Sequence, residues 1–150
     1  MHDAEIYAKH ADELVRFATV LVGPSAAEDV VSEAVTRAFG SSGWQSVQHH
    51  RAYLFRATLN QARQACRTDR RRARRETLAV SDPCVGDSPH VRVEVLDALR
   101  RLNVRQRAVV FLTYWHDLES TEVAELLEIS TRTVQRELTV ARRHLEVLLT

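Results

Sequence analysis

The sequence contains few residues that favour turns, with four glycines and three prolines among 150 residues. A protein built from many short strands needs more turn residues than this. Alanine, leucine, valine, arginine and glutamate are abundant, which favours helices over strands. Because 45% of the residues are hydrophobic, the chain can bury a core and is not expected to be disordered. We therefore predict an all-α fold.

Cysteines and long apolar segments are equally scarce. The two cysteines, Cys66 and Cys84, are too few for a disulfide framework or a four-ligand zinc site, and we expect ordinary thiols in a reducing compartment. No basic segment leads into an apolar one at the N-terminus, and no apolar run is long enough to cross a bilayer. These absences predict a cytoplasmic protein with no membrane insertion.

Charge is unevenly distributed, although the net charge of the whole chain is +1. Residues 1–40 contain seven acids and three bases, whereas residues 41–75 contain nine arginines and one aspartate. Residues 76–91 contain three acids and no base, and residues 92–150 contain nine of each. Within 63–75, seven arginines accompany a single acid, Asp69. Such an excess cannot be balanced by ion pairs within the segment, so it predicts contact with a polyanion.

Hydrophobic spacing predicts three helices in the first half of the chain. Apolar residues recur at three- and four-residue intervals over about residues 3–22, 25–39 and 51–75, as they do on one face of a helix. Ser25 and Glu28 fit a capping box at the start of the second helix. The segment 40–50 is a loop by composition, and its Trp44 either anchors the loop on the core or serves a ligand.

A domain boundary is expected at residues 77–91, which contain two of the three prolines and two aspartates. This composition predicts a flexible linker between a domain at 1–76 and a domain at 92–150. In the second domain we expect helices over about residues 93–102, 105–115, 120–127 and 131–149. Trp115 is one of the residues expected to be buried there.

The last two of these helices have a helix-turn-helix pattern. Ala124 is the small residue that lets the helices cross closely, Ile129 is the apolar residue of the turn, and Val134 points inward. Ser130 can cap the second helix. Arginine pairs well with guanine and glutamine with adenine. The side chains expected to face a DNA major groove are Arg132, Thr133, Gln135 and Arg136.

Three segments, taken together, resemble the extracytoplasmic-function, or group IV, sigma factors of the sigma-70 family. Residues 26–39, AAEDVVSEAVTRAF, are similar to the family's polymerase-binding helix in region 2. Residues 51–67, RAYLFRATLNQARQACR, resemble the helix that meets the −10 promoter element. Residues 102–142 resemble region 4, which binds the −35 element. The resemblance covers nearly the whole length of the chain.

The resemblance implies a sigma factor without catalytic activity that binds core RNA polymerase and directs it to promoters. It implies that 1–76 is region 2, that 77–91 is a linker reaching toward the polymerase active-site channel, and that 92–150 is region 4. The implied partners are core RNA polymerase, through its large-subunit clamp and its flap, promoter DNA, and an anti-sigma factor or other regulatory protein. Neither a cofactor nor a metal ion is implied.

The resemblance also assigns site residues. Those expected to contact polymerase are Asp29, Ser32, Glu33, Thr36 and Arg37. Those expected at the −10 element are Trp44, Arg56, Asn60, Arg63, Arg67, Arg70 and Arg71, with the loop 40–50 holding an unstacked base. Those expected at the −35 element are Arg132, Thr133, Gln135, Arg136, Arg142 and Arg143, of which the last two would meet phosphates.

Several positions depart from the family pattern. Ser32 stands where glutamine is common, and Glu128 stands where glycine is usual in the turn. Gln135, Glu137 and Val140 stand where basic residues are common. Loss of positive charge at the −35 face weakens phosphate contacts. The sequence is therefore compatible with a weak grip on the −35 element, with help from another protein, or with an unusual recognised sequence.

Three other interpretations stay open. A free-standing helix-turn-helix regulator would explain the second domain but not the helix at 25–39 or the arginine run. A degenerate sigma-like protein would bind polymerase or an anti-sigma factor without initiating transcription. An enzyme is disfavoured, because His49, His50 and Cys66 have no carboxylate or second cysteine at ligand spacing and no glycine-rich phosphate loop is present.

Overall fold

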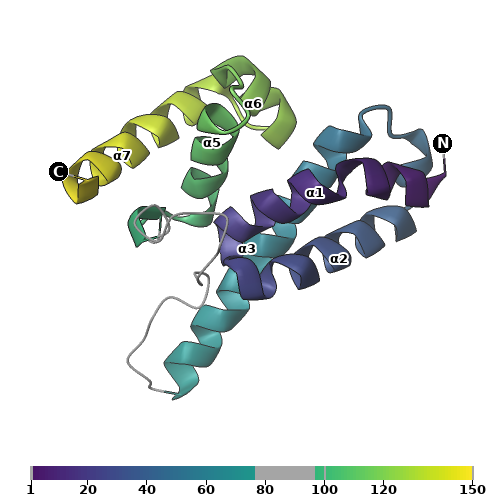
Figure 1. Ribbon diagram of the computed structural model, residues 1–150, viewed down its shortest axis with the longest axis horizontal. Helices are drawn as coiled ribbons and strands as arrows, with labels where there is room; N and C mark the ends of the chain where they lie inside the picture. The colour runs from purple at the N-terminus through teal and green to yellow at the C-terminus, as the bar shows by residue number, and fades with distance from the viewer. Residues whose placement is uncertain (1, 77–96, 100, 150) are drawn as a thin grey trace.

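The computed structural model describes residues 2–76, 97–99 and 101–149. Within these ranges every regular element is helical, as the all-α prediction requires (Figure 1). The elements are α1 (Asp3–Val22), α2 (Pro24–Gly40), a short 3-10 helix (Trp44–Ser46), α3 (His50–Glu76), α5 (Val104–Tyr114), α6 (Ser120–Leu127) and α7 (Thr131–Leu149). These bounds agree to within one residue with the six helices predicted for the same segments. The predicted linker at 77–91 and half of the helix predicted over 93–102, namely residues 93–96 and 100, lie outside the described residues.

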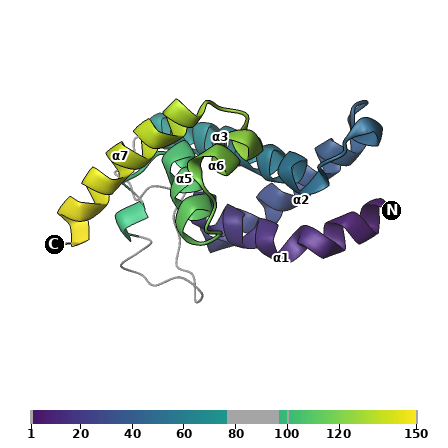
Figure 2. The same cartoon turned by 90° about the horizontal axis from the view of Figure 1, so that it is seen from above.

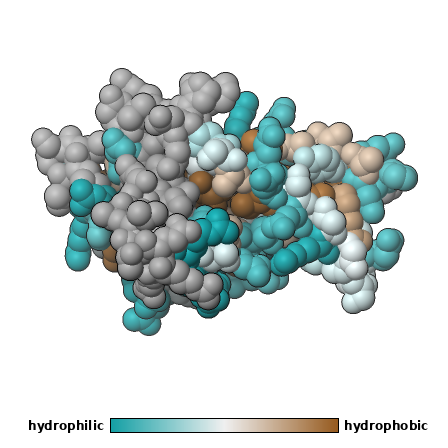
Figure 3. All heavy atoms as spheres, turned by 90° about the horizontal axis from the view of Figure 1, so that it is seen from below, coloured by the Kyte–Doolittle hydropathy of each residue, from teal (hydrophilic) through white to brown (hydrophobic). Residues whose placement is uncertain are grey.

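The first three helices pack on one another around large apolar side chains. Leu14 and Phe17 of α1, Val31 of α2, and Leu54 and Phe55 of α3 are fully buried. The rings of Phe17 and Phe55 lie 4.9 Å apart. Burying a side chain of this size contributes about 1.5–3 kcal/mol. On the face drawn in Figure 3, hydrophobic areas are small and separated by hydrophilic ones.

The start of α2 differs from the predicted capping box. The helix begins at Pro24, with Gly23 as the N-cap at φ 87°, and no side chain caps it. Proline suits the first helical position because its φ is already helical and its missing N–H would have no partner there. Glycine tolerates the positive φ that turns the chain from α1 into α2. Ser25 therefore lies inside the first turn, and the prediction that it caps the helix with Glu28 is wrong.

The helix-turn-helix prediction is confirmed in its packing. Ala124 and Val134 are buried, and Ile129 packs against the core from the turn. Glu128 adopts the left-handed conformation at φ 56°, and the Ile129 N–H donates to the Ala124 carbonyl at 3.1 Å, as in a Schellman motif. Ser130 caps α7, since the Thr133 N–H donates to its Oγ at 3.0 Å.

The two halves of the chain pack directly against each other. Helix α5 contacts α1 and α3, and α6 lies beside α3 (Figure 2). Arg107 of α5, 1% exposed, donates from Nη1 to the Leu21 carbonyl at 2.8 Å and from Nε to the Leu99 carbonyl at 2.9 Å. The last turn of α1 contains no basic residue, so Arg107 supplies a donor for carbonyls that a helix C-terminus leaves without one.

Two predictions about side chains and one about membranes have direct outcomes. Cys66 is disulfide-bonded, so the expectation of an ordinary thiol at this position is wrong; Cys84 lies outside the described residues. Trp115 is 50% exposed, because it follows the last residue of α5, where its ring packs on that of Phe111 at a centroid distance of 5.9 Å; the prediction that Trp115 is buried is wrong. Among the described helices, none is both long and apolar enough to span a bilayer.

Candidate nucleic-acid and protein interfaces

The polar face of α2 is exposed along its whole length. All five residues that the sequence places at a polymerase contact are exposed, namely Asp29, Ser32, Glu33, Thr36 and Arg37. Two of them are held from α3: Gln61 Nε2 donates to Glu33 Oε2, and Arg37 Nη1 donates to Gln64 Oε1 at 3.1 Å. These contacts orient a mixed acidic and basic surface without covering it.

Trp44 is an anchor of its loop on the core. Its side chain is 3% exposed, and its Nε1 donates to Asp3 Oδ1 at 3.0 Å. The indole packs against Phe39 and Tyr53, with ring centroids 4.9 Å and 5.5 Å away. A ring held in this way cannot stack on a nucleotide base without leaving the core. Of the two roles that the sequence left open for Trp44, we therefore favour anchoring of the loop and omit Trp44 from the residues proposed to contact DNA.

The N-terminal half of α3 faces α6. Arg56 Nη1 donates to the Leu126 carbonyl at 3.3 Å, and its Nε lies 3.6 Å from Glu128 Oε1. Asn60 is exposed, but it lines a cavity of about 470 Å³ together with Arg56 and Glu128. Two residues predicted to meet the −10 element therefore lie beside the end of α6.

The C-terminal half of α3 carries the arginine run. Arg67, Arg70 and Arg71 are exposed, and Arg63 is half-buried. Arg63, Arg67 and Arg70 line a cleft together with Arg105 of α5. Burial, followed by the charges of Arg105 and Arg67, lowers the pKa of the Arg63 guanidinium. Like charges gathered this closely favour an anionic partner.

The N-terminal part of α7 presents an open polar face. Arg132, Gln135 and Arg136 are exposed. Thr133 is partly buried, with its hydroxyl 2.8 Å from that of Ser130, so it supports the cap as well as bordering the face. Three base-reading candidates of suitable chemistry therefore point outward together.

Further along α7, Arg142 and Arg143 are exposed. Arg142 Nε donates to the Tyr114 hydroxyl at 2.8 Å, and its guanidinium lies 5.9 Å from the centroid of that ring. Tyr114 therefore fixes the direction in which the exposed Arg142 guanidinium points.

Glu137 does not belong to the open face of α7. Its Oε2 is buried, and the residue lines the cleft that holds Arg63 and Arg105. Glu137 was predicted from the sequence to reduce the positive charge of the −35 face, but its side chain lines this cleft instead. A glutamate two positions after Gln135 is turned to another side of the helix.

A second cluster joins α1, α3 and the segment after α5. Arg51 Nε pairs with Glu13 Oε1, and Arg51 Nη2 lies 3.3 Å from His116 Nδ1. The His116 ring packs edge-on against Phe111 and Phe55, at 5.0 Å and 5.9 Å. Burial and the neighbouring Arg51 lower the pKa of His116 below its ordinary value of 6.5. The neutral imidazole can therefore accept from Arg51.

The sequence pattern did not single out Arg105, Arg107, Tyr114 or His116. A signal for Arg107 was present, because it stands three residues after Val104 and four before Phe111, on the apolar face of its helix. A charged residue at such a position indicates a buried hydrogen-bonded partner. Nothing in the sequence indicates that α1 supplies that partner. Among the described residues, no three His, Cys, Asp or Glu side chains are grouped to hold a metal ion.

Known proteins with similar sequences are sigma factors. Residues 92–145 match the family described as Sigma-70, region 4. The chain is 32% identical over 142 residues to the RNA polymerase sigma-E factor of Streptomyces antibioticus, covering 87% of this chain and 75% of that protein. It is 31% identical over 163 residues to the ECF RNA polymerase sigma factor SigL of Mycobacterium tuberculosis, covering 96% and 86%.

A solved structure has the same fold. The sigma factor RpoE of Bartonella quintana, in complex with the anti-sigma factor NepR, aligns with a TM-score of 0.73 at 19% identity. The alignment covers 97% of this chain and 95% of that one. The likeness therefore extends over both halves of the molecule.

Proposed function

The chain belongs to the extracytoplasmic-function family of RNA polymerase sigma factors, and from this membership we propose which of its surfaces bind polymerase and which bind promoter DNA. As a sigma factor it directs transcription initiation. We infer that it has no catalytic activity of its own, that it acts in the cytoplasm, and that it consists of region 2 at 1–76, a linker at 77–91 and region 4 at 92–150.

The polymerase contact is assigned to the outer face of α2, at Asp29, Ser32, Glu33, Thr36 and Arg37. The support for this assignment is exposure combined with orientation, because Gln61 and Gln64 hold two of the charged side chains from α3. Region 4 would meet the polymerase flap. A surface that is both charged and pre-ordered loses little conformational entropy when it binds.

The DNA contacts are assigned to two helices. On α3, the −10 element would be met by Arg56, Asn60, Arg63, Arg67, Arg70 and Arg71. On α7, the −35 element would be met by Arg132, Thr133, Gln135, Arg136, Arg142 and Arg143. The observation that carries the proposal is the capped helix-turn-helix, whose second helix exposes Arg132, Gln135 and Arg136 on one side.

A regulatory protein is also part of the proposal. RpoE of Bartonella quintana is in complex with the anti-sigma factor NepR, and the present chain aligns with RpoE over nearly its full length. We therefore expect an anti-sigma factor or a similar protein to bind this chain.

The polymerase assignment can be tested by reversing charge on α2. Asp29→Arg combined with Glu33→Arg should abolish co-purification with core polymerase, because both acids are exposed on the proposed contact. The matched control is Glu5→Arg combined with Asp12→Arg, which makes the same charge change at exposed positions of α1 and should leave binding intact. Circular dichroism checks that both variants fold. Undiminished co-purification of the α2 variant would reject the assignment. In a separate experiment, mapping where transcripts start when the wild-type chain is added to core polymerase would show which promoters it reads.

A further inference from the structure

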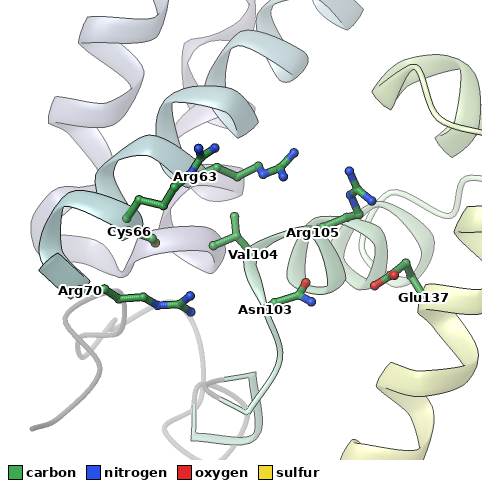
Figure 4. A pocket seen from close by; sticks show the side chains of 8 residues that line it. Arg63, Cys66, Arg70, Asn103, Val104, Arg105 and Glu137 are labelled. Carbon is green, nitrogen blue, oxygen red and sulfur yellow. The ribbon is translucent and has the colours of Figure 1, made fainter.

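A cleft between α3 and α5 brings together arginines from the two halves of the chain (Figure 4). Its volume is about 380 Å³, which lies in the roughly 300–1,000 Å³ range of small-molecule sites. Arg63 and Arg70 extend from α3 toward α5, and Glu137 extends from α7 toward Asn103 (Figure 4). The four arginines that line the cleft are Arg63, Arg67, Arg70 and Arg105.

These guanidinium groups have no acidic partner in the described part of the chain. The ion pairs found there involve Glu13 and Glu128, at other places in the fold. Bringing like charges together and partly burying them is unfavourable, and the lowered pKa of Arg63, caused first by burial and then by Arg105 and Arg67, reflects this. A bound anion with several negative oxygens would relieve the repulsion.

The start of α5 adds to the positive potential. Asn103 is its N-cap, and Asn103, Val104 and Arg105 all line the cleft. The Gln106 N–H donates to Asn103 Oδ1 at 2.8 Å, so the capping box satisfies that donor. The positive end of the helix dipole still points toward the cleft, where it favours phosphate groups.

Glu137 distinguishes this cleft from a simple phosphate site. Its Oε2 is buried and has no hydrogen-bond partner among the described residues. Because Oε2 is shielded, a ligand in the cleft meets only the part of the Glu137 carboxylate that lines it. A deprotonated phosphate is repelled there, whereas a ribose hydroxyl can donate to it, as riboses do to acidic residues in dinucleotide sites.

We propose that the cleft binds a nucleoside 5′-polyphosphate, with its phosphates on the four arginines and the start of α5, and with a ribose hydroxyl donating to Glu137. Because Arg63, Arg67 and Arg70 also belong to the proposed −10 surface, the nucleotide would compete with promoter DNA. This competition rests on the proposed function, but the binding itself does not. The nucleotide would also bridge α3 and α5, and so hold the two halves together.

The test is calorimetric titration of the full chain with ATP, GTP and inorganic tripolyphosphate. Arg105→Ala should weaken binding of all three by about tenfold or more, because one charge-assisted contact is lost. Arg105 is outside the set assigned to promoter DNA, so this effect is independent of DNA binding. The control is Arg16→Ala, which removes an exposed arginine of α1 that does not line the cleft. Circular dichroism confirms that the variants fold.

A second variant tests the sugar contact. Glu137→Gln should tighten tripolyphosphate binding, since a negative charge is removed, and should reduce the preference for ATP over tripolyphosphate by about tenfold. Equal affinity of the wild-type chain for ATP and tripolyphosphate would overturn the nucleotide assignment. Unchanged binding in Arg105→Ala would overturn the site. Nucleotide binding that follows these expectations in a chain that does not bind polymerase would leave this inference standing while the proposed function fails.

Discussion

The two helices proposed to read DNA, α3 and α7, differ in how their arginines are engaged. On α3, Arg56 contacts the Leu126 carbonyl and Glu128 of α6. On α7, Arg132 and Arg136 are exposed and form no ion pair within the described residues. Arginine on α3 therefore forms contacts within the molecule, whereas arginine on α7 is available to a partner.

This difference bears on how promoter DNA is met. In the arrangement described here, α7 is open while the first half of α3 lies against α6. For Arg56 and Asn60 to reach DNA, the contact between α3 and α6 must be exchanged for contacts with the nucleic acid. Net charge does not reveal this, because it counts engaged and available arginines alike.

The largest effect is expected from the residue that joins the two halves. Arg107→Ala removes the donor to the Leu21 and Leu99 carbonyls, and leaving two buried acceptors unsatisfied should cost roughly 2–4 kcal/mol of the free energy of unfolding. Urea denaturation measures this loss. The control, Arg101→Ala, removes an exposed arginine and should change stability by less than about 0.5 kcal/mol. A loss below about 1 kcal/mol in Arg107→Ala would mean that the halves are held together mainly by other contacts.

The open face of α7 should behave as a sequence reader. Arg136→Ala should reduce discrimination between bases at one position of the −35 element by about 1–3 kcal/mol, if the Arg136 guanidinium pairs with a guanine. Arg143→Ala should instead weaken binding to all sequences about equally. Titration against a panel of single-base variants of a mapped promoter separates the two outcomes. Uniform weakening by Arg136→Ala would move this residue to the phosphate-contacting set.

The contact between the halves should weaken in acid. Burial is the main cause that lowers the pKa of His116, and the positive charges of Arg51 and Arg16 lower it further. The negative charges of Glu13 and Asp117 raise it, but by less. Since the folded pKa lies below 6.5, the unfolded chain binds the proton more readily, and stability falls as pH drops from 6.5 through the folded value. Thermal unfolding followed between about pH 5 and pH 7.5 should show this decline. Replacement His116→Gln should flatten it, and an equally steep decline in that variant would assign the effect to another group.

The smallest effect is expected at the turn between α6 and α7. Glu128→Gly relieves the left-handed strain of about 1 kcal/mol and removes an ion pair whose glutamate is 70% exposed, worth about 0–1 kcal/mol. Stability should therefore change by less than about 1 kcal/mol, while release of Arg56 should tighten DNA binding a few-fold. The control is Glu125→Ala, an exposed acid of α6 outside this ion pair. Weaker DNA binding by Glu128→Gly, measured by fluorescence anisotropy, would contradict a covering role for Glu128.

Local pattern predicted much of this molecule correctly. The bounds of the helices follow from hydrophobic period and from residues such as Ser130, which caps α7. The prediction failed at Ser25, where proline at the preceding position displaced the helix start. It also failed at Trp115, because the end of α5 leaves that side chain outside the core. Trp44 had two interpretations, and the choice depended on Asp3, which lies 41 positions away in sequence.

The sequence by itself determined the helical class, the helix-turn-helix and the segregation of arginine, because these depend on residues within a few turns of one another. The tertiary structure alone decided which charged groups are available. Arg107 became a buried donor to α1, Arg56 a partner of Glu128, and Arg105 a fourth member of the cleft only when distant segments were brought together. The physical reason is that desolvation and pairing depend on three-dimensional neighbours, and these are not encoded in local spacing.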